Sequence, residues 1–441
     1  MTTAENLKEK IESRKSQLGV IGLGYVGLPL AVRAAAVGFP VLGFDVSLER
    51  VAAIQSGESY IGDVPTEALK PLVQSGALNA TTDFTRLAEC DVIVICVPTP
   101  LNVTRDPDMK YIRIASEDIT RTLRSGQLIV LESTTYPGTT EELVLQRLAA
   151  SGLAVGEDFF LAFSPERIDP GQVSSKGWTV ENTPKIVGGV TMRCTDLAVA
   201  FYSHITSQVV PVSSPRVAEL AKLFENIFRV VNIALVNELT LLCDQMNLNV
   251  WEVIDAAATK PFGFMKFTPG PGVGGHCIPI DPFYLSWKAR EYGLSTRFIE
   301  LAGEINLHMP SYVRELVIRA LNAGRKSLNG SLIVLLGVAY KKDVADYRES
   351  PAFRIIDLLE HDGARVVCCD PYVDEFQSHD GRMFQTVPLS DDLLSSADCV
   401  VIITDHSVFD YKQIVEKSPV VVDTRNATRD VQQGREKIVL L

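Results

Sequence analysis

The stretch Leu18-Gly-Val-Ile-Gly-Leu-Gly-Tyr-Val-Gly-Leu-Pro-Leu-Ala31 decides the fold of the N-terminal part of the chain. It runs from a short apolar strand into a helical pattern, and Gly22, Gly24 and Gly27 stand between the two with Gly-x-Gly-x-x-Gly spacing. Such a turn lets a pyrophosphate approach the backbone, and the helix N-terminus supplies amide donors and a positive dipole. The motif alone is a weak signal, so its context matters.

Asp45 supplies that context, because it ends the next apolar strand, Val41–Asp45. A carboxylate at this place accepts hydrogen bonds from the adenosine ribose hydroxyls and repels a 2′-phosphate. The sequence therefore predicts an NAD site rather than an NADP site. The alternative, a glycine-rich turn in a sheet that binds nothing, leaves Asp45 as a coincidence.

Apolar runs alternate with helical patterns on both sides of a helical centre. Continuous apolar runs without alternation are typical of strands buried on both faces of a parallel sheet. The expected strands include residues 91–97, 128–131, 159–163 and 185–187 in the first half, and 331–337, 364–370, 398–403 and 420–423 in the second. This pattern predicts an α/β fold with two Rossmann-like, doubly wound domains, joined by a long central helix and a small helical domain.

The central helix is expected from Ser214 to Asn247, with Pro215 at its favoured position in the first turn. Its apolar residues recur at helical spacing, and its length makes it a natural dimerisation element. Further helices are expected over 249–258 and 283–325. We therefore expect domains at 1–212 (NAD-binding), 213–325 (helical, dimerising) and 326–441 (a second, smaller α/β domain).

Composition narrows the class of protein. The chain has 441 residues and a formal net charge of −12, which disfavours nonspecific binding of nucleic acid. The eight cysteines form no Cys-x-x-Cys pair and indicate a reducing compartment. The N-terminal residues do not resemble a signal peptide, and the apolar runs are short for a membrane span. A cytoplasmic protein is expected, with no nucleic-acid or membrane partner. No metal site is expected, because the six histidines are dispersed.

A single cysteine, Cys277, lies in the run Phe267–Pro282, after glycines at 270, 272, 274 and 275 and four residues before Asp281. Glycines let the backbone approach a ligand, and a thiolate is a strong nucleophile when its pKa is lowered. Covalent catalysis by Cys277 is one interpretation, and a buried cysteine on a tight turn is the other.

Six ordered motifs resemble the nucleotide-sugar 6-dehydrogenases, the UDP-glucose/UDP-N-acetylhexosamine dehydrogenase family, nearly from end to end. They are Gly-Leu-Gly-Tyr-Val-Gly-Leu-Pro-Leu-Ala (22–31), Glu-Ser-Thr-Thr-Tyr-Pro-Gly-Thr-Thr (132–140), Phe-Ser-Pro-Glu-Arg (163–167), Glu-Leu-Ala-Lys-Leu-Phe-Glu-Asn (219–226), Gly-Gly-His-Cys-Ile-Pro-Ile-Asp-Pro (274–282), and Ala-Tyr-Lys-Lys-Asp (339–343) with Arg-Glu-Ser-Pro (348–351). The resemblance implies NAD as cofactor, a UDP-binding C-terminal domain and a homodimer or larger homo-oligomer. The cysteine motif is most similar to the branch that oxidises UDP-N-acetylglucosamine.

The reaction that the resemblance implies is a four-electron oxidation of a C6 hydroxyl to a carboxylate, with two NAD reduced. Cys277 would hold the aldehyde as a thiohemiacetal and then a thioester. Lys222 and Asn226, four apart on one helix face, would donate to an oxygen that gains negative charge. A surface lysine and a solvated asparagine are the alternative for this pair.

Other roles follow from the same motifs. Asp281 would take a proton through Lys222 or a water, or hold Lys222 in place; its alternative is a helix cap. Glu166 would activate the hydrolytic water, against the alternative of an ion pair with Arg167 or another cation. Thr134 would contact that water or the nicotinamide. His276 is not expected to act, because adjacent side chains in an extended loop point apart.

Further residues are expected to bind the substrate or the cofactor. Lys260, Lys266 and Lys341 are cations that would meet the diphosphate, although a solvated surface charge is the alternative for each. Substrate binding is expected from Glu166, Arg167, Lys222, Asn226, Lys266, Phe267, Gly274 and Lys341. Cofactor binding is expected from Gly22, Gly24, Tyr25, Val26, Gly27, Asp45, Thr99, Thr134 and Arg348. If the resemblance holds, both α/β domains contribute to one cleft.

Several alternatives stay open at this stage. The same chemistry on UDP-N-acetylmannosamine, UDP-N-acetylgalactosamine or UDP-glucose would use the same motifs. A two-electron dehydrogenase of a small hydroxy acid would share the N-terminal domain, but it needs neither Cys277 nor residues 331–441. A non-catalytic sensor of NAD or a nucleotide sugar is a third class, against which the presence of Cys277, Lys222 and Asp281 argues.

Overall fold

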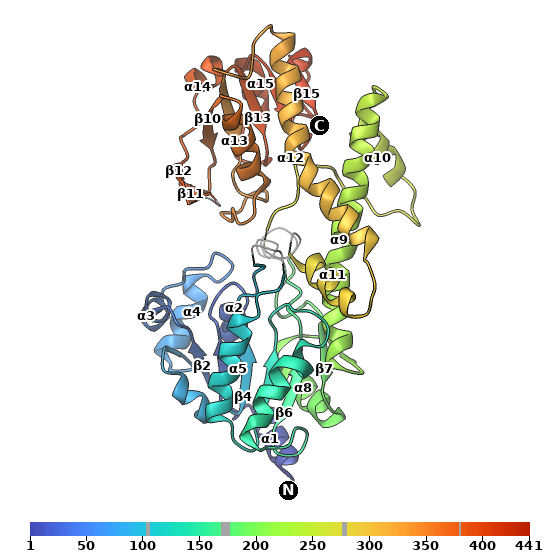
Figure 1. The fold of residues 1–441 in the computed structure, drawn as a ribbon. Helices are drawn as coiled ribbons and strands as arrows, with labels where there is room; N and C mark the ends of the chain where they lie inside the picture. The colour runs from blue at the N-terminus through green and yellow to red at the C-terminus, as the bar shows by residue number, and fades with distance from the viewer. Residues whose placement is uncertain (103–105, 169–176, 276–279, 379–380) are drawn as a thin grey trace. The chain divides into compact units, whose positions relative to one another are not determined.

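The computed structural model describes residues 1–102, 106–168, 177–275, 280–378 and 381–441 (Figure 1). The chain forms two compact units. Unit 1 comprises Met1–Glu225 with Trp287–Gly293, and unit 2 comprises Asn226–Ser286 with Leu294–Leu441. Each unit carries its own parallel sheet and its own apolar core. The three-domain boundaries expected from the sequence stay a prediction.

Unit 1 is built on an eight-stranded sheet with the order β3-β2-β1-β4-β5-β6-β7-β8. The strands are β1 (Leu18–Ile21), β2 (Val41–Phe44), β3 (Leu78–Thr81), β4 (Val92–Ile95), β5 (Leu128–Leu131), β6 (Phe160–Phe163), β7 (Lys185–Gly189) and β8 (Val209–Val212). The first six are parallel, in the order 3-2-1-4-5-6 of a Rossmann fold. Strand β7 is antiparallel to β6, so the expectation of a wholly parallel sheet was wrong at this strand.

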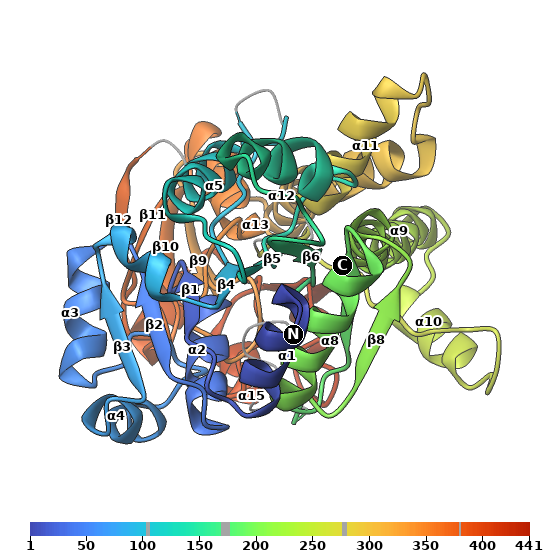
Figure 2. The same ribbon diagram turned by 90° about the horizontal axis from the view of Figure 1, so that it is seen from below.

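Helices cover both faces of this sheet. The α-helices are α1 (Thr3–Glu12), α2 (Gly27–Ala36), α3 (Leu48–Ser56), α4 (Thr66–Gln74), α5 (Lys110–Thr122) and α8 (Met192–Ile205). A 3-10 turn, η1, spans Phe84–Glu89. The segment from Thr140 to Ser151 is helical throughout and consists of the π-helix η2 (Thr140–Leu145), α6 (Gln146–Leu148) and the 3-10 turn η3 (Ala149–Ser151). Seen from below, α1 lies beside α8 (Figure 2), and the two helices are in contact.

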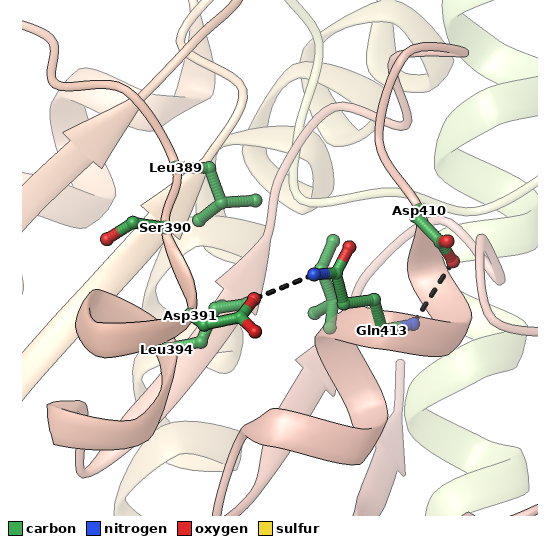
Figure 3. Close-up of a pocket in the computed structure, with 7 residues that line it drawn as sticks. Leu389, Ser390, Asp391, Leu394, Asp410 and Gln413 are labelled. Carbon is green, nitrogen blue, oxygen red and sulfur yellow. Dashed lines mark hydrogen bonds between the residues drawn. The ribbon is translucent and has the colours of Figure 1, made fainter.

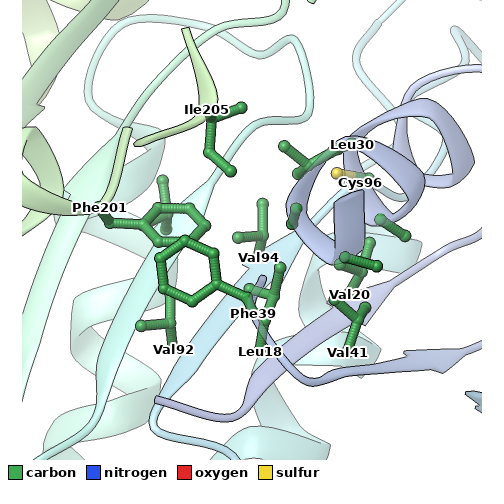
Figure 4. Close-up of a cluster of buried hydrophobic side chains, with 14 of the residues drawn as sticks. Leu18, Val20, Leu30, Phe39, Val41, Val92, Val94, Cys96, Phe201 and Ile205 are labelled. Carbon is green, nitrogen blue, oxygen red and sulfur yellow. The ribbon is translucent and has the colours of Figure 1, made fainter. Parts of the chain in front are cut away.

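The core of unit 1 explains the continuous apolar runs in the sequence. Alternate residues of β1 and β4, such as Val20 and Val94, pack with Phe39 and Phe201 between the sheet and helices α2 and α8 (Figure 4). Every residue of β1, β4, β5 and β6 is buried. Because both faces are covered, neither face of these strands needs polar residues.

Helix α9 (Pro215–Gln245) begins in unit 1 and continues into unit 2. It starts at Pro215, whose fixed φ suits the first helical turn. It ends before Asn247, which adopts a left-handed backbone with φ +55°, and the next amide, from Leu248, donates to the Cys243 carbonyl at 2.9 Å. This arrangement is a common way to end a helix.

Among the described helices, α9 alone is long and apolar enough to cross a membrane, judged by length and composition. Its most apolar window has a mean hydropathy of 1.4, and 39% of that window is buried within the chain. Core helices of soluble proteins pass the same test, so one such helix is weak evidence for a span.

Unit 2 contains a five-stranded parallel sheet with the order β10-β9-β13-β14-β15. Its strands are β9 (Leu332–Leu336), β10 (Arg365–Cys369), β13 (Cys399–Ile402), β14 (Val421–Asp423) and β15 (Ile438–Leu440); a hairpin is formed by β11 (Glu375–Gln377) and β12 (Met383–Gln385). The helices are α10 (Val250–Ala258), α12 (Arg297–Ala323), α13 (Pro351–His361), α14 (Asp391–Ser396) and α15 (Tyr411–Lys417), with the 3-10 turn η4 (Arg435–Lys437). Helix α11 (Asp281–Glu291) starts in unit 2.

The two sheets place an aspartate at equivalent positions. In unit 1, Asp45 follows β2 and accepts a hydrogen bond from the amide of Leu23, in the loop after β1, at 2.9 Å. In unit 2, Asp370 follows β10 and accepts from the amide of Val338, in the loop after β9, at 2.7 Å. Asp370 also contacts the Nε2 of the fully buried His406 at 3.2 Å. The two sheets therefore share a local arrangement, in which the aspartate after one strand accepts from the loop after the neighbouring strand.

Candidate cofactor and active site

The glycine turn after β1 has the geometry that a dinucleotide needs. Gly22 has φ +89°, a conformation that only glycine adopts without strain, and a Cβ on Gly27 would lie 1.9 Å from the Gly22 carbonyl oxygen. A Cβ on Gly24 would meet no atom within 4 Å. Gly22 and Gly27 are therefore required by the fold itself, whereas Gly24 leaves open space before the N-terminus of α2, where a phosphate would bind.

Asp45 is held in place at the carboxyl end of β2. It is buried, one oxygen accepts from the amide of Leu23, and the other accepts from the amide of Ser47 at 2.9 Å. The Arg50 guanidinium lies 3.4 Å from the first oxygen. A fixed carboxylate beside the glycine turn suits the hydroxyls of an adenosine ribose. The residues of this edge therefore fit NAD.

The other expected cofactor residues of unit 1 lie around the same edge of the sheet. Tyr25, on the glycine turn, is 45% exposed, and Val26 is the N-cap residue of α2. Thr99 is buried and follows β4, whereas the half-buried Thr134 follows β5. Ligands of open α/β sheets bind at this edge, outside the carboxyl ends of the strands.

The loop that follows Thr134 is held by Glu219 of α9, a residue that the sequence had offered only as part of a motif. The buried Glu219 carboxylate accepts from the amides of Gly138 and Thr140, at 2.5 and 2.9 Å, and from the Thr140 hydroxyl at 2.7 Å. Burial raises the pKa of Glu219, and these donors oppose that rise. One side chain therefore fixes the Thr134 loop to the helix that carries Lys222.

Glu166 does not pair with Arg167, the first of its two alternative partners. Its Oε2 accepts from Lys185 Nζ at 3.0 Å, and its Oε1 accepts from the amides of Arg167 and Ile168 at 2.6 and 2.7 Å. Burial alone would raise the pKa of Glu166, but Lys185 and the amides hold it below its usual value. The Arg167 guanidinium instead pairs with Glu225 at 2.6 Å.

Lys185 belongs to a buried cluster that sequence reasoning did not single out. Its ammonium lies 2.9 Å from Glu132 Oε1, and the Tyr202 hydroxyl donates to the same carboxylate at 2.5 Å. The Cys96 thiol lies 3.7 Å from the other oxygen of Glu132. Burial raises the pKa of Glu132, whereas the two carboxylates raise the pKa of Lys185 against the effect of burial. The cluster therefore keeps Lys185 charged.

The expected catalytic residues of α9 are buried rather than solvated. Lys222 is 7% exposed and Asn226 is 3% exposed. In unit 2, the Asn226 amide donates to the carboxylate of Asp281, the first residue of α11, at 2.5 Å. The surface alternatives for Lys222 and Asn226 were therefore wrong. Asp281 therefore lies in the first turn of α11 and accepts a hydrogen bond from Asn226, while its expected roles toward Lys222 and in proton transfer stay predictions.

The glycine-rich loop before Cys277 packs closely within unit 2. The Gly270 amide donates to the buried Asn237 of α9 at 3.0 Å, and Asn237 donates to Asn306 of α12 at 2.9 Å. A Cβ on Gly274 would lie 2.7 Å from Tyr340 Cβ, in the Ala-Tyr-Lys-Lys-Asp motif. A Cβ on Gly270 would lie 2.6 Å from the Arg425 guanidinium, a cation that sequence reasoning missed.

The residues of unit 2 that are expected to bind the diphosphate, the sugar nucleotide or the cofactor lie in different surroundings. Lys266 forms an ion pair with Asp255, and Lys260 lies over the Phe262 ring at 5.0 Å. The Arg348 guanidinium donates a bidentate pair of hydrogen bonds to the Asp346 carboxylate, at 2.9 and 2.7 Å. Phe267 packs against Phe228 of α9, with ring centroids 5.9 Å apart. The roles of these residues, and that of Lys341, stay predictions.

Cys277 and His276 lie outside the described residues, so their expected roles stay predictions. Among the described residues, no group of three or more His, Cys, Asp or Glu side chains is arranged to hold a metal. A small cavity of about 70 Å³ in unit 2 is lined by residues of α14, α15 and the segments before them, including Asp391 and Gln413 (Figure 3). None of the expected site residues lines it.

Comparison with known proteins identifies the parts of the chain. Residues 16–206 match the NAD binding domain of the UDP-glucose/GDP-mannose dehydrogenase family, residues 216–308 its central domain, and residues 334–430 its UDP binding domain.

Relatives match over nearly their whole length. The chain is 35% identical to the UDP-N-acetyl-D-mannosamine dehydrogenase of Pyrococcus horikoshii over 425 residues, which cover 95% of this chain and 97% of that protein. It is also 35% identical to the UDP-N-acetyl-D-glucosamine 6-dehydrogenase of Salmonella typhi over 398 residues, which cover 89% and 90%. A solved structure of the UDP-D-ManNAc dehydrogenase from Pyrococcus horikoshii superposes with a TM-score of 0.86 and 32% identity, covering 96% of this chain and 98% of that one.

The glycine turn, the fixed Asp45 and the strand order of unit 1 define an α/β protein with a dinucleotide-binding domain. With all three family domains present in order and relatives that align along their full length, the chain belongs to the UDP-glucose/GDP-mannose dehydrogenase family. Both the family and the cofactor expected from the sequence are thereby confirmed.

Proposed function

We propose that this protein oxidises the C6 hydroxyl of UDP-N-acetyl-D-glucosamine to the carboxylate, with two NADH formed per sugar. The family assignment supports nucleotide-sugar oxidation, and a relative named UDP-N-acetyl-D-glucosamine 6-dehydrogenase is 35% identical. The structural observation that carries the proposal is the buried contact between Asn226 and Asp281. It joins α9 to the residues that follow Cys277, where alcohol and thiol chemistry must meet.

The first oxidation needs a proton acceptor and a hydride acceptor. NAD, when bound, supplies the hydride acceptor for both oxidation steps. Lys222 and Asn226 stabilise the negative charge that develops on the C6 oxygen, and Asp281 accepts the proton of the C6 hydroxyl through a water. Lys222 suits this role because its buried ammonium makes no hydrogen bond or ion pair within the described ranges of the chain.

The second oxidation needs a covalent hold on the aldehyde. The Cys277 sulfur adds to the aldehyde carbon as its thiol proton passes to the carbonyl oxygen, and the resulting thiohemiacetal loses a hydride from carbon and a proton from its hydroxyl to give a thioester. A water, deprotonated by Glu166, then attacks the thioester carbon; the C–S bond breaks and releases the sugar acid and the thiol. Thr134 assists by contacting this water. Without the covalent bond, a free aldehyde would escape.

The binding roles follow the expected sets. Gly22, Gly24 and Gly27, with the N-terminus of α2, hold the pyrophosphate of NAD, and Asp45 holds the ribose. Lys266, Phe267, Gly274 and Lys341 bind the nucleotide sugar from unit 2. Arg425 joins this set, because its guanidinium packs against Gly270 in the same loop.

The experiment mixes the protein with NAD and a panel of UDP-sugars and follows NADH absorbance. Two NADH per UDP-N-acetylglucosamine consumed is the expected stoichiometry, and one NADH per sugar would contradict the four-electron reaction. Cys277→Ala is expected to abolish formation of the acid while NAD still binds. Full turnover by that variant would remove Cys277 from the mechanism.

UDP-N-acetylmannosamine is the second candidate substrate. The relative from Pyrococcus horikoshii, which aligns over 95% of this chain, is named a UDP-N-acetyl-D-mannosamine dehydrogenase. The two sugars differ only in the configuration at C2, so kcat/KM measured for both decides between them. A ratio of at least about 10 in favour of one sugar corresponds to about 1.4 kcal/mol of differential transition-state binding.

We further propose that the protein forms a homodimer through α9. It is proposed to act in the cytoplasm, in polysaccharide synthesis. Leu220, Phe224, Leu235 and Leu242 on α9 are 43%, 65%, 60% and 55% exposed. Their spacing places them along one stripe of the helix. Apolar stripes of this length are seldom left in water, and a second copy would cover this one.

A further inference from the structure

A strand reversal brings a lysine to the edge of the sheet where the parallel strands end. Glu132 and Glu166 follow the carboxyl ends of β5 and β6. Because β7 is antiparallel to β6, its first residue, Lys185, lies at that same edge. The ammonium of Lys185 contacts both carboxylates, at 2.9 and 3.0 Å.

The geometry points to Lys185 as a positioning residue for Glu166, holding the carboxylate in the orientation and charge state that water activation requires. This inference rests on the proposed hydrolysis step and deepens it. Lys185 itself touches neither the water nor the sugar.

The hydrogen bonds of Glu166 leave a defined place for that water. A carboxylate has about four acceptor positions. Oε1 accepts from the amides of Arg167 and Ile168, and Oε2 accepts from Lys185. One position on Oε2 is left within the described part of the chain, and the side chain is 12% exposed. Lys185 therefore fixes both the rotamer of Glu166 and the direction of its remaining lone pair.

The positive charge of Lys185 affects the protonation of the two carboxylates beside it. The groups that face it are Glu132 after β5, Glu166 after β6 and Tyr202 on α8, whose ring lies 5.2 Å from the ammonium; Cys96 after β4 contacts Glu132. Lys185 is 3% exposed. Without its charge, two carboxylates would share a buried space, and at least one would take up a proton.

Water gives one proton to Glu166 while its oxygen bonds to the thioester carbon, and the C–S bond then breaks with the electron pair moving to sulfur. The resulting thiolate takes up a proton. A Glu166 that has lost the hydrogen bond fixing its rotamer, or that has itself taken up a proton, accepts the proton of water poorly, so loss of Lys185 is expected to slow hydrolysis and to leave the preceding oxidation steps intact.

The test compares Lys185→Met with wild type in rapid mixing with NAD and the preferred UDP-sugar. The variant is expected to form two NADH per site in a burst and then to turn over about 100-fold more slowly, because a positioned base contributes at least this factor. Intact-protein mass spectrometry is expected to show the acylated chain accumulating. The acid limb of the kcat profile is expected to move to higher pH, a shift that a merely structural role would not produce.

The chain offers a matched control in Lys288. This buried lysine also lies between two glutamates, Glu142 and Glu291, both at 2.7 Å, and over a tyrosine ring, that of Tyr136, at 5.1 Å. Lys288→Met is expected to give no burst and no shift of the acid limb. The same burst in both variants would overturn the inference, since it would then reflect a general loss of packing.

The double variant Lys185→Met with Glu132→Gln keeps the test decisive if the single variant does not fold. It removes one positive and one negative charge together, so no additional buried charge is left unbalanced. Slow hydrolysis after a burst is expected here too. Hydrolysis at the wild-type rate would overturn the inference, because Lys185 would then serve only to neutralise Glu132. Failure of wild type to form two NADH would instead refute the proposed function.

Discussion

The amide of Asn226 donates a hydrogen bond to the carboxylate of Asp281, 55 residues further along the chain, at 2.5 Å. Both side chains are at least 97% buried. This contact ties the middle of α9 to the first residue of α11 within unit 2. It brings together two residues that the sequence had proposed for one site on separate grounds.

Replacing Asn226 tests the contribution of this contact. Asn226→Ala removes a donor from a buried carboxylate, which is expected to lower the free energy of unfolding by about 1–3 kcal/mol. Urea denaturation measures the loss. The half-buried Asn232 of the same helix, whose side-chain amide donates to the Phe228 carbonyl four residues before it, provides the control. Equal stability of Asn226→Ala and wild type would show that the contact contributes nothing.

Two glycines of the NAD turn are expected to respond differently to alanine. Gly27→Ala places a Cβ against the Gly22 carbonyl and is expected to destabilise the protein by about 1–3 kcal/mol. Gly24→Ala meets no protein atom, so its melting temperature is expected to be unchanged while its dissociation constant for NAD rises about 10-fold or more. Thermal unfolding and NAD titration separate the two effects. Normal NAD affinity of Gly24→Ala would place the pyrophosphate elsewhere.

Asp45 is expected to set the preference for NAD. Asp45→Ala removes the carboxylate that repels a 2′-phosphate and frees Arg50, now 3.4 Å from Asp45, to meet that phosphate. The ratio of kcat/KM for NAD to that for NADP is expected to fall by about 10-fold or more, equivalent to about 1.4 kcal/mol. Steady-state kinetics with both cofactors measures the ratio. An unchanged ratio would assign the discrimination to another residue.

The raised pKa of Glu219 predicts how the stability of the protein depends on pH. Burial raises its folded pKa above the ordinary value of 4.5, so the folded state holds the proton more tightly than the unfolded state does. Its contribution to the free energy of unfolding is present below the unfolded pKa and is lost as pH rises through the folded pKa. The stability of wild type relative to Glu219→Gln is therefore expected to fall from pH 4.5 upward, as measured by urea denaturation at a series of pH values. An advantage of wild type that grows with pH would mean that the donors of Gly138 and Thr140 outweigh burial.

The apolar stripe of α9 predicts the behaviour of an oligomer. The double variant Leu235→Glu with Leu242→Glu is expected to be a monomer in sedimentation velocity, whereas wild type is expected to be a dimer. Each substitution would place a charge in an apolar interface. The control is Met192→Glu on α8, an apolar residue that is 75% exposed and lies off the stripe. A monomeric wild type, or a dimer that survives both substitutions, would contradict an interface on this stripe.

The sequence predicted most strands because burial on both faces leaves a continuous apolar run, as in β1, β4 and β5. It could not predict the reversal of β7, since the composition of a strand is the same in either direction. Lys185 was missed for this reason. A lone lysine that begins an apolar strand is more often a solvated residue, and only the reversal brings it to Glu132 and Glu166.

The candidate site was partly accessible from sequence for a similar reason. Asp45 and the glycine turn lie within one local unit whose spacing carries its own geometry. Glu219 was missed as a positioning residue because its partners, Gly138 and Thr140, are about 80 residues away in the chain. Contacts at that separation leave no periodic signal.

The equivalent aspartates of the two sheets, Asp45 and Asp370, have different surroundings. After β2, Asp45 accepts hydrogen bonds from the amides of Leu23 and Ser47 and lies beside Arg50. After β10, Asp370 accepts from the amides of Val338, Ala339 and Tyr372 and also contacts His406. A sugar hydroxyl arriving at Asp370 would have to displace a ring that is wholly inaccessible. In the second sheet, the carboxylate thus acts as an internal brace between the loops that follow neighbouring strands.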